Sequence, residues 1–199
     1  MILTFNNKIL SAGSKWLEQG SSPTPGPGFR TVIVGNQEWM AENLTIDDGG
    51  AGIVHFDNVT ANGVNFGTQY YYSRAAAERI ATALGDGWHL PNINEWGALA
   101  TDLGGVSKAG PYLKSTSGWD SDGNGVDSLG WTGLPCGYYD YYDGLSRYGT
   151  RGSWLTSTNA ISYDQPYTYD LEYNSTWLDR LLQQYANNRY SVRLVRDVT

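Results

Sequence analysis

The first element that the pattern of residues predicts in the main part of the chain is a β-hairpin near residue 30. Residues 31–34 are a β-branched run, Gly35-Asn36 is a dipeptide typical of a two-residue hairpin turn, and residues 37–40 supply the return strand. The pattern therefore predicts that the main domain opens with two antiparallel strands.

Two later segments repeat their apolar residues at helical spacing. The first, residues 74–84, follows Ser73, which is a suitable N-cap, and stops before Gly85. One face of this predicted helix carries Ala77, Ile80 and Leu84.

The second predicted helix begins at Asn92, because Glu95 three positions later completes a capping box. Its apolar stripe consists of Trp96, Leu99 and Leu103. The following glycine pair ends the helix.

Beyond about residue 115, helical spacing gives way to short strands separated by Gly, Asp and Ser. Tyr169, Leu171 and Tyr173 alternate with polar residues, which predicts a strand buried on one face. A last strand is predicted from the alternation of Tyr190, Val192 and Leu194. A hairpin, two helices and a strand-rich half together predict an α+β domain.

The first 29 residues are interpreted as an appendage to this domain. Residues 1–20 contain strand-like pieces at 2–5 and 8–10 but are too few to fold alone, which favours an attachment or oligomerisation segment. Residues 21–29 form a Pro/Gly/Ser-rich linker, and residues 30–199 form the main domain.

Composition and charge limit the partners that the chain can bind. A formal net charge of −7 and only 13 basic residues argue against nucleic acid and anionic membranes. No apolar run approaches the ~18 residues that a membrane span needs, so we expect no membrane insertion. Cys136 is the single cysteine, so the sequence offers neither an internal disulfide nor a cysteine-based zinc site.

The first ten residues are not expected to act as a signal peptide. Asn6, Asn7 and Lys8 would interrupt its apolar core. We therefore expect synthesis in the cytoplasm and arrival at the cell exterior by another route, such as within a virus particle (a phage tail) released by lysis.

Four segments, taken in order, carry a family resemblance. They are GNQEWMAENL at 35–44, GWHLP with Glu95-Trp96 at 87–96, LKSTSGW at 113–119 and SVRLVRD at 191–197. Together they resemble the Fibrobacter succinogenes major paralogous domain over about residues 30–197. That family is similar to the C-type-lectin-like fold and to formylglycine-generating enzymes.

The resemblance implies a C-type-lectin-like domain in which the N- and C-terminal strands pair and two helices flank a small sheet. Members often carry a cysteine where this chain has Leu194, so a disulfide of relatives is absent. Formylglycine-generating enzymes need a cysteine pair, which Cys136 alone does not supply. His55 lies in a loop, His89 is interpreted as a packed structural residue, and no catalytic motif is present. We therefore predict that the protein is not an enzyme and binds no cofactor.

The same fold is used by variable proteins of diversity-generating retroelements, including a phage tropism determinant. This similarity implies an exposed C-terminal ligand face and, by analogy with that phage protein, a homotrimer formed through the N-terminal segment. Eleven of the 15 tyrosines lie within residues 138–190, among Asp, Asn, Ser and Arg. Rigid, amphipathic tyrosines beside adaptable polar residues are the composition of antibody paratopes.

Not every aromatic side chain is expected on that face. Tyr138, Tyr169 and Tyr173 are expected to pack inward. The tyrosines expected to be exposed lie among turn residues: Tyr139, Tyr141, Tyr142, Tyr148, Tyr163, Tyr167 and Tyr185. Trp177 stays open between burial and exposure. Ligand contacts are expected in the loops 139–148, 163–167 and 174–185. The predicted ligand-binding residues are Tyr139, Tyr141, Tyr142, Arg147, Tyr148, Tyr163, Tyr167, Asn174, Trp177, Asp179, Arg180 and Tyr185.

One loop has the start of a calcium-binding motif. Asp120, Asp122 and Asn124 reproduce the D-x-D-x-N-G start of an EF-hand loop, and Asp127 follows as a fourth candidate ligand, but the twelfth position is Trp131 instead of Glu. We favour a turn built from Asx hydrogen bonds and keep calcium as the alternative. The sugar-binding tripeptide of C-type lectins is also missing, so a glycan would be held by aromatic rings without metal.

These observations predict a non-enzymatic receptor-binding protein, a phage tail-tip or fibre adhesin with a diversified tyrosine-rich face. Its partner would be a host surface protein or glycan. An alternative is a bacterial surface lectin-like protein that binds glycans, and a third is a scaffold without a ligand beyond its own assembly.

Overall fold

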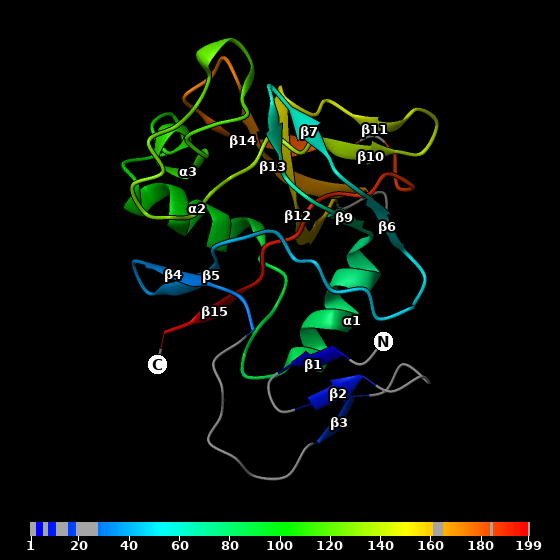
Figure 1. The fold of residues 1–199 in the computed structure, drawn as a ribbon. Helices are drawn as coiled ribbons and strands as arrows, with labels where there is room; N and C mark the ends of the chain where they lie inside the picture. The colour runs from blue at the N-terminus through cyan, green and yellow to red at the C-terminus, as the bar shows by residue number, and fades with distance from the viewer. Residues whose placement is uncertain are drawn as a thin grey trace.

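The computed structural model describes residues 28–160, 165–183 and 185–198, together with three short strands near the N-terminus (Figure 1). These strands are β1 (Leu3–Phe5), β2 (Lys8–Leu10) and β3 (Trp16–Glu18), paired antiparallel in the order β1-β2-β3. Strands therefore occur at both predicted pieces of the N-terminal segment. The predicted linker lies almost entirely outside the described residues.

The predicted hairpin is present as β4 (Thr31–Val34) and β5 (Gln37–Met40). Gly35 at the turn has a φ of 58°, a conformation that glycine adopts without strain. The last strand, β15 (Val195–Asp197), pairs antiparallel with β5 and places Val195 opposite Trp39. The two ends of the main domain therefore close into one sheet, as the family resemblance implies.

Helix α1 (Arg74–Leu84) has the predicted bounds, and its N-cap is Ser73, whose side chain accepts a hydrogen bond from the N–H of Ala76. The apolar face of α1 is buried. It packs in a core cluster with Leu155 on one strand and Tyr190 near the C-terminus.

Helix α2 (Ile93–Asp102) begins with the predicted capping box. The Asn92 side chain accepts from two N–H groups of the first turn, and Glu95 accepts from the N–H of Asn92 at 2.7 Å. Glu95 also binds Nε2 of His89 at 2.5 Å, while Nδ1 of His89 lies 2.8 Å from the carbonyl of Gly87. His89 therefore joins the preceding loop to the start of α2, although its side chain is 42% exposed and so less packed than predicted.

The pair of His89 and Glu95 predicts a pH dependence of stability. The hydrogen bond with Glu95 raises the pKa of His89 above 6.5. Burial alone would raise the pKa of Glu95, but hydrogen bonds from His89 and Asn92 outweigh burial and lower it below 4.5. The stability that His89 contributes is fully present below its pKa in the unfolded chain and is lost as pH rises through its raised pKa in the folded protein. The stability that Glu95 contributes is lost as pH falls through its lowered pKa in the folded protein.

Thermal melting should therefore show a midpoint that declines from pH 6 to pH 8, and Glu95→Gln should flatten this decline. Glu78→Gln is the matched control, because Glu78 is exposed and lies 4.0 Å from Arg74. An equal decline in wild type and Glu95→Gln would contradict the role assigned to the pair.

The central sheet has the order β12-β13-β14, formed by β12 (Arg151–Asn159), β13 (Pro166–Glu172) and β14 (Leu178–Leu182). Smaller antiparallel pairs join β6 (Ile53–Phe56) to β9 (Gln69–Tyr72), β7 (Thr60–Ala61) to β8 (Val64–Asn65) and β10 (Tyr138–Asp140) to β11 (Gly144–Ser146). The short helix α3 (Gly110–Leu113) and the 3-10 turn η1 (Asp120–Asp122) connect α2 to these strands. The domain is therefore α+β, as predicted.

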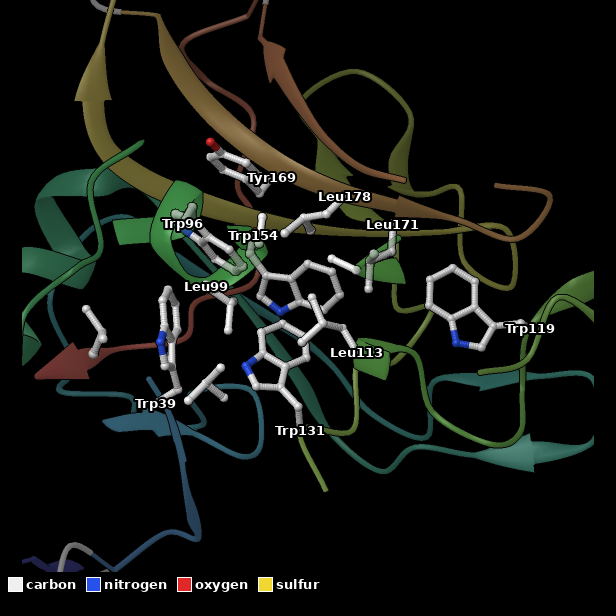
Figure 2. Close-up of a cluster of buried hydrophobic side chains, with 14 residues drawn as sticks. Trp39, Trp96, Leu99, Leu113, Trp119, Trp131, Trp154, Tyr169, Leu171 and Leu178 are labelled. Atoms are coloured by element: carbon white, nitrogen blue, oxygen red, sulfur yellow. The ribbon is translucent and has the colours of Figure 1, made fainter. Parts of the chain in front are cut away.

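Tryptophans fill the core on one side of the central sheet. Figure 2 shows Trp39, Trp96, Trp131 and Trp154 gathered beneath Tyr169 of β13. Trp96 stacks on Tyr169 with ring centroids 5.2 Å apart, and Trp131 meets Trp154 edge-on at 5.1 Å. Leu155, the next residue of β12, belongs to the second cluster around α1, so β12 is covered on both faces.

The prediction that β13 is buried on one face was wrong. Tyr169 and Leu171 are buried as expected, but Asp170 between them is fully buried too. Its carboxylate accepts hydrogen bonds from Thr168 and Ser153. Burial raises the pKa of Asp170 to about 6, against the opposing effect of its hydrogen bonds and of Arg151.

The C-terminal alternation shows the same departure. Tyr190, Val192 and Leu194 are buried as predicted, but Arg193 is also buried completely. Arg193 lies between an isolated bridge at Ser191 and strand β15, and its backbone belongs to no regular strand.

Among the described residues, no helix is both long and apolar enough to cross a bilayer.

Candidate ligand-binding surface

The hairpin β10–β11 projects from the side of the molecule opposite α2 and α3 (Figure 1). Gly137 begins it with a φ of 64°, and a Cβ at this position would lie 1.9 Å from the carbonyl oxygen of Ser146. Only glycine fits there, because backbone atoms cannot move away as a side chain can. The N–H of Gly137 donates to the carbonyl of Arg151 at 2.7 Å and ties the hairpin to β12.

The tip of this hairpin is fixed by a side-chain clasp. Oδ1 of Asp140 accepts from the N–H groups of Tyr142 and Asp143, at 2.9 and 3.2 Å. Oδ2 of Asp140 accepts from Nδ2 of Asn188 at 3.1 Å, and Oδ1 of Asn188 accepts from the N–H of Tyr141 at 3.0 Å. The clasp therefore holds the hairpin tip against the segment around residue 188.

Three exposed tyrosines lie over the clasp and form what we call the tyrosine patch: Tyr141, Tyr142 and Tyr185. Their side chains are 54%, 76% and 52% exposed. The rings of Tyr141 and Tyr142 meet edge-on at 5.2 Å, and those of Tyr142 and Tyr185 at 6.2 Å. Two segments that are more than 40 positions apart in sequence therefore present one continuous aromatic surface.

Tyr139 lies in β10, one position before Asp140 of the clasp, and is less exposed than predicted. It is half-buried, and its ring lies 6.2 Å from that of Phe56. Its N–H and carbonyl exchange two hydrogen bonds with Arg189, at 2.9 and 3.0 Å. Tyr138 was predicted to pack inward, and it stacks on buried Tyr190 at 5.7 Å.

Arg147 and Tyr148 follow β11 and are both exposed, as predicted. Arg147 adopts a φ of 62°, and its carbonyl accepts hydrogen bonds from Thr150 and Arg151 that close a tight turn. Gly149, which directly follows Tyr148, accepts from the N–H of Asp120 at 2.9 Å through its carbonyl. Tyr148 therefore stands beside the η1 turn.

The predicted residues on the central sheet have mixed exposure. Arg180 on β14 is exposed, and its guanidinium lies 5.4 Å from the ring centre of Tyr167. Tyr167 is half-buried, which corrects its predicted exposure, because it sits in β13 between two neighbouring strands. Asp179 is half-buried, and burial raises its pKa.

Asn174 and Trp177 are exposed, but they lie in another part of the molecule. The carbonyl of Thr176 accepts from the N–H of Gly110 at 2.9 Å, which places this segment beside α3. Nζ of buried Lys114 donates to the carbonyl of Ser175 at 2.7 Å and fixes the turn from inside. Burial lowers the pKa of Lys114 to about 8.

The predicted surface is thus divided. Tyr141, Tyr142 and Tyr185 come together, whereas Trp177 lies beside α3. Tyr163 lies outside the described residues. No local pattern of the sequence points to Asp140 and Asn188 as the residues that hold the patch, because they are 48 positions apart.

The calcium candidates are engaged in loop hydrogen bonds. Oδ1 of Asp120 accepts from Asn62 at 2.6 Å, and Oδ1 of Asn124 accepts from the N–H of Trp119 at 3.0 Å. Both carboxylate oxygens of Asp127 accept from Thr132. Asp122 is exposed at the end of η1. Within the described residues, no group of three His, Cys, Asp or Glu side chains could hold a metal ion.

This arrangement predicts that calcium does not stabilise the fold. A chelator should leave the thermal midpoint unchanged, whereas Asp127→Ala should lower stability by about 1–3 kcal/mol because two donors of Thr132 lose their acceptor. Differential scanning calorimetry with and without added calcium measures both effects. A midpoint that falls on chelation would restore the calcium interpretation.

Cys136 is not placed for chemistry. It is buried, and burial raises the pKa of its thiol well above the usual value, which leaves little thiolate at neutral pH. Its backbone carbonyl accepts from the hydroxyl of Tyr71 at 2.6 Å. The residue acts as a packed part of the core.

Comparison with known proteins gives one family. The sequence profile of the Fibrobacter succinogenes major domain matches residues 32–196. No curated protein and no solved structure matches the chain. The matched region begins in β4 and ends in β15, so it includes the whole domain that carries the tyrosine patch.

Proposed function

The chain belongs to the Fibrobacter succinogenes major domain family, and from this premise we propose that it is a non-enzymatic ligand-binding protein that uses the tyrosine patch. The observation that carries the proposal is the presentation of Tyr141, Tyr142 and Tyr185 in mutual contact above the clasp of Asp140 and Asn188. Tyrosines held in place before binding lose little conformational entropy when a ligand arrives.

The patch has the character of a protein-binding hot spot. Exposed aromatic side chains on a rigid support are enriched among residues that dominate binding energy. Asp143 and Asn187 beside the patch are exposed and supply a polar rim. The net charge of −7 disfavours a polyanionic ligand and leaves a neutral or basic surface as the better partner.

We propose that the ligand is a host surface molecule and that the protein acts as a phage tail-tip or fibre adhesin with a C-type-lectin-like fold. The paratope-like composition of residues 138–190 supports this assignment. Purified protein with a fluorescent label should bind saturably to a subset of bacterial strains, and unlabelled protein should displace it. Binding to no strain, or unsaturable binding to all, would contradict an adhesin.

We also propose that the patch is diversified, which the DNA around the coding sequence can test. DNA around the coding sequence should contain a reverse transcriptase gene and a near-copy of the segment that encodes the C-terminal region. The copy should differ from the coding segment mainly at adenines. Without these features, the patch would be an ordinary, fixed binding surface.

Trp177 supports a second candidate, a lectin-like protein that binds glycans. Trp177 is 49% exposed, and its backbone N–H donates to Oγ of Ser175 at 3.0 Å, which holds the backbone while leaving the side chain accessible. Flat aromatic rings can stack on sugars without a metal ion. A glycan array probed with wild type and Trp177→Ala separates the two candidates, because binding that depends on Trp177 and not on Tyr142 favours the lectin.

A further inference from the structure

Strand β14 lies at the edge of the central sheet. The sheet order is β12-β13-β14, and within the described part of the chain β14 pairs with no strand other than β13. Such an edge presents backbone N–H and C=O groups that a further strand can bind.

The register between β13 and β14 shows which backbone groups of β14 point away from β13. Gln183, just after β14, donates its N–H to the carbonyl of Pro166 at 3.0 Å. Hydrogen-bonded and non-hydrogen-bonded pairs alternate along antiparallel strands. Leu181 and Asp179, two and four positions earlier, therefore direct their backbone groups toward β13 as Gln183 does.

The intervening positions, Leu178, Arg180 and Leu182, direct their backbone groups away from β13. Leu178 confirms this orientation, because its N–H donates to the carbonyl of Val106, which is not part of the sheet, at 2.8 Å. Arg180 and Leu182 come next along the edge. Both side chains are exposed, Leu182 by 46%, so solvent reaches this part of the edge.

We propose that a second copy of this chain adds to the edge, so that two β14 strands pair antiparallel about a twofold axis at Leu181. In this register, Arg180 of one copy is opposite Leu182 of the other. Both positions face outward, so each such pair exchanges two backbone hydrogen bonds, and symmetry supplies two pairs. The edge is therefore self-complementary in hydrogen bonding, and the sheets of two copies become continuous.

Side chains favour this register over registers with the axis at Arg180 or Asp179. With the axis at Leu181, Asp179 lies opposite Gln183, and Leu181 lies opposite itself. An axis at Arg180 would place two guanidinium groups opposite each other, and an axis at Asp179 would place two carboxylates opposite each other. Like charges directly opposed across a strand pair are destabilising.

A strand of five residues provides a small interface. The contact falls below the ~1,000 Å² typical of stable complexes, so we expect a monomer–dimer exchange that depends on concentration. The tyrosine patch residues Tyr141 and Tyr142 are on the hairpin β10–β11 and not on β14. Two copies joined in this way carry two such hairpins, which raises avidity for a surface with repeated ligands.

Sedimentation velocity of the full-length protein, with no ligand, tests the proposal independently of the proposed function. The mass should rise from 21.9 kDa toward twice that value between micromolar and millimolar concentrations. Leu182→Pro removes an outward N–H, which an edge strand tolerates, and should keep the protein monomeric. Leu182→Val is the matched control: it keeps the N–H and should dimerise as wild type does, and circular dichroism confirms that both variants fold.

Hydrogen exchange locates the contact. Amides of Arg180 and Leu182 should exchange at least tenfold more slowly in concentrated than in dilute protein, while those of Asp179 and Leu181, which donate to β13, should be slow in both. A monomer at all concentrations overturns the proposal. So does a dimer or trimer that persists in Leu182→Pro or leaves the amides of Arg180 and Leu182 unprotected.

Discussion

Replacing Tyr142 by serine is expected to weaken binding to host cells by about thirtyfold or more, which corresponds to at least ~2 kcal/mol. Tyr142 is the most exposed residue of the patch and contacts both of the other tyrosines. Its loss removes the central ring and also the edge-on support of Tyr141 and Tyr185. Titration of labelled protein on cells measures the change as an altered dissociation constant.

The matched control is Tyr112→Ser. Tyr112 is 42% exposed on α3, away from the hairpin β10–β11 (Figure 1). This variant should bind as wild type does, and both variants should melt at nearly the wild-type temperature because both rings are on the surface. Equal binding by wild type and Tyr142→Ser would show that the tyrosine patch is not the contact surface.

A substitution in the clasp can be measured in the same binding titration. Asn188→Ala removes the bonds from Asn188 to Asp140 and to the N–H of Tyr141, but leaves all three tyrosines in place. If the patch works because it is held rigid, binding should weaken although no ring is lost. Combined with Tyr142→Ser, the losses should not add, since both act on one surface.

Replacing Arg193 by leucine is expected to destabilise the fold by about 3–5 kcal/mol. The guanidinium is fully buried and donates to Oδ1 of Asn43 at 3.0 Å, and to the carbonyls of Met40 at 3.0 Å, Thr132 at 2.8 Å and Trp131. It also lies 4.0 Å from the ring centre of Trp131. Leucine cannot donate, so buried carbonyls from two different segments, residues 40–43 and 131–132, would lose their partner.

Urea denaturation measures the effect, with Arg30→Leu as control. Arg30 is exposed and pairs with Glu42 at 2.9 Å, so its loss should change the free energy of unfolding by less than about 1 kcal/mol. Arg193→Lys should fall between wild type and Arg193→Leu, because an ammonium group has fewer donors than the guanidinium fork. A loss below about 1 kcal/mol in Arg193→Leu would mean that the carbonyls find other partners.

Local sequence determined the elements whose signals are short-range. The turn at Gly35, the N-cap at Ser73 and the capping box of Asn92 and Glu95 each involve residues within three positions of one another. The predicted hairpin and both helices therefore appear at the expected positions. Long-range pairing of β15 with β5 was available only from the family resemblance.

The candidate surface was predicted less completely. The sequence identified Tyr141, Tyr142 and Tyr185 as exposed and correctly placed Tyr138 inward. The exposure of Tyr139 and Tyr167 was overestimated. Their sequence neighbours are typical of turns, but both residues lie within strands. Whether separate tyrosines form one patch depends on distances that a linear pattern does not contain.

By itself, the sequence determined the α+β class, the hairpin, the two helices and the family, because capping, turn chemistry and motif order are properties of neighbouring residues. The tertiary structure alone decided that Asp170 and Arg193 are buried and that Asp140 meets Asn188. A polar residue in an alternating strand is normally placed in solvent, and its burial depends on partners that distant segments supply. The physical reason is that a buried polar group is stable only when folding has assembled all of its hydrogen bonds.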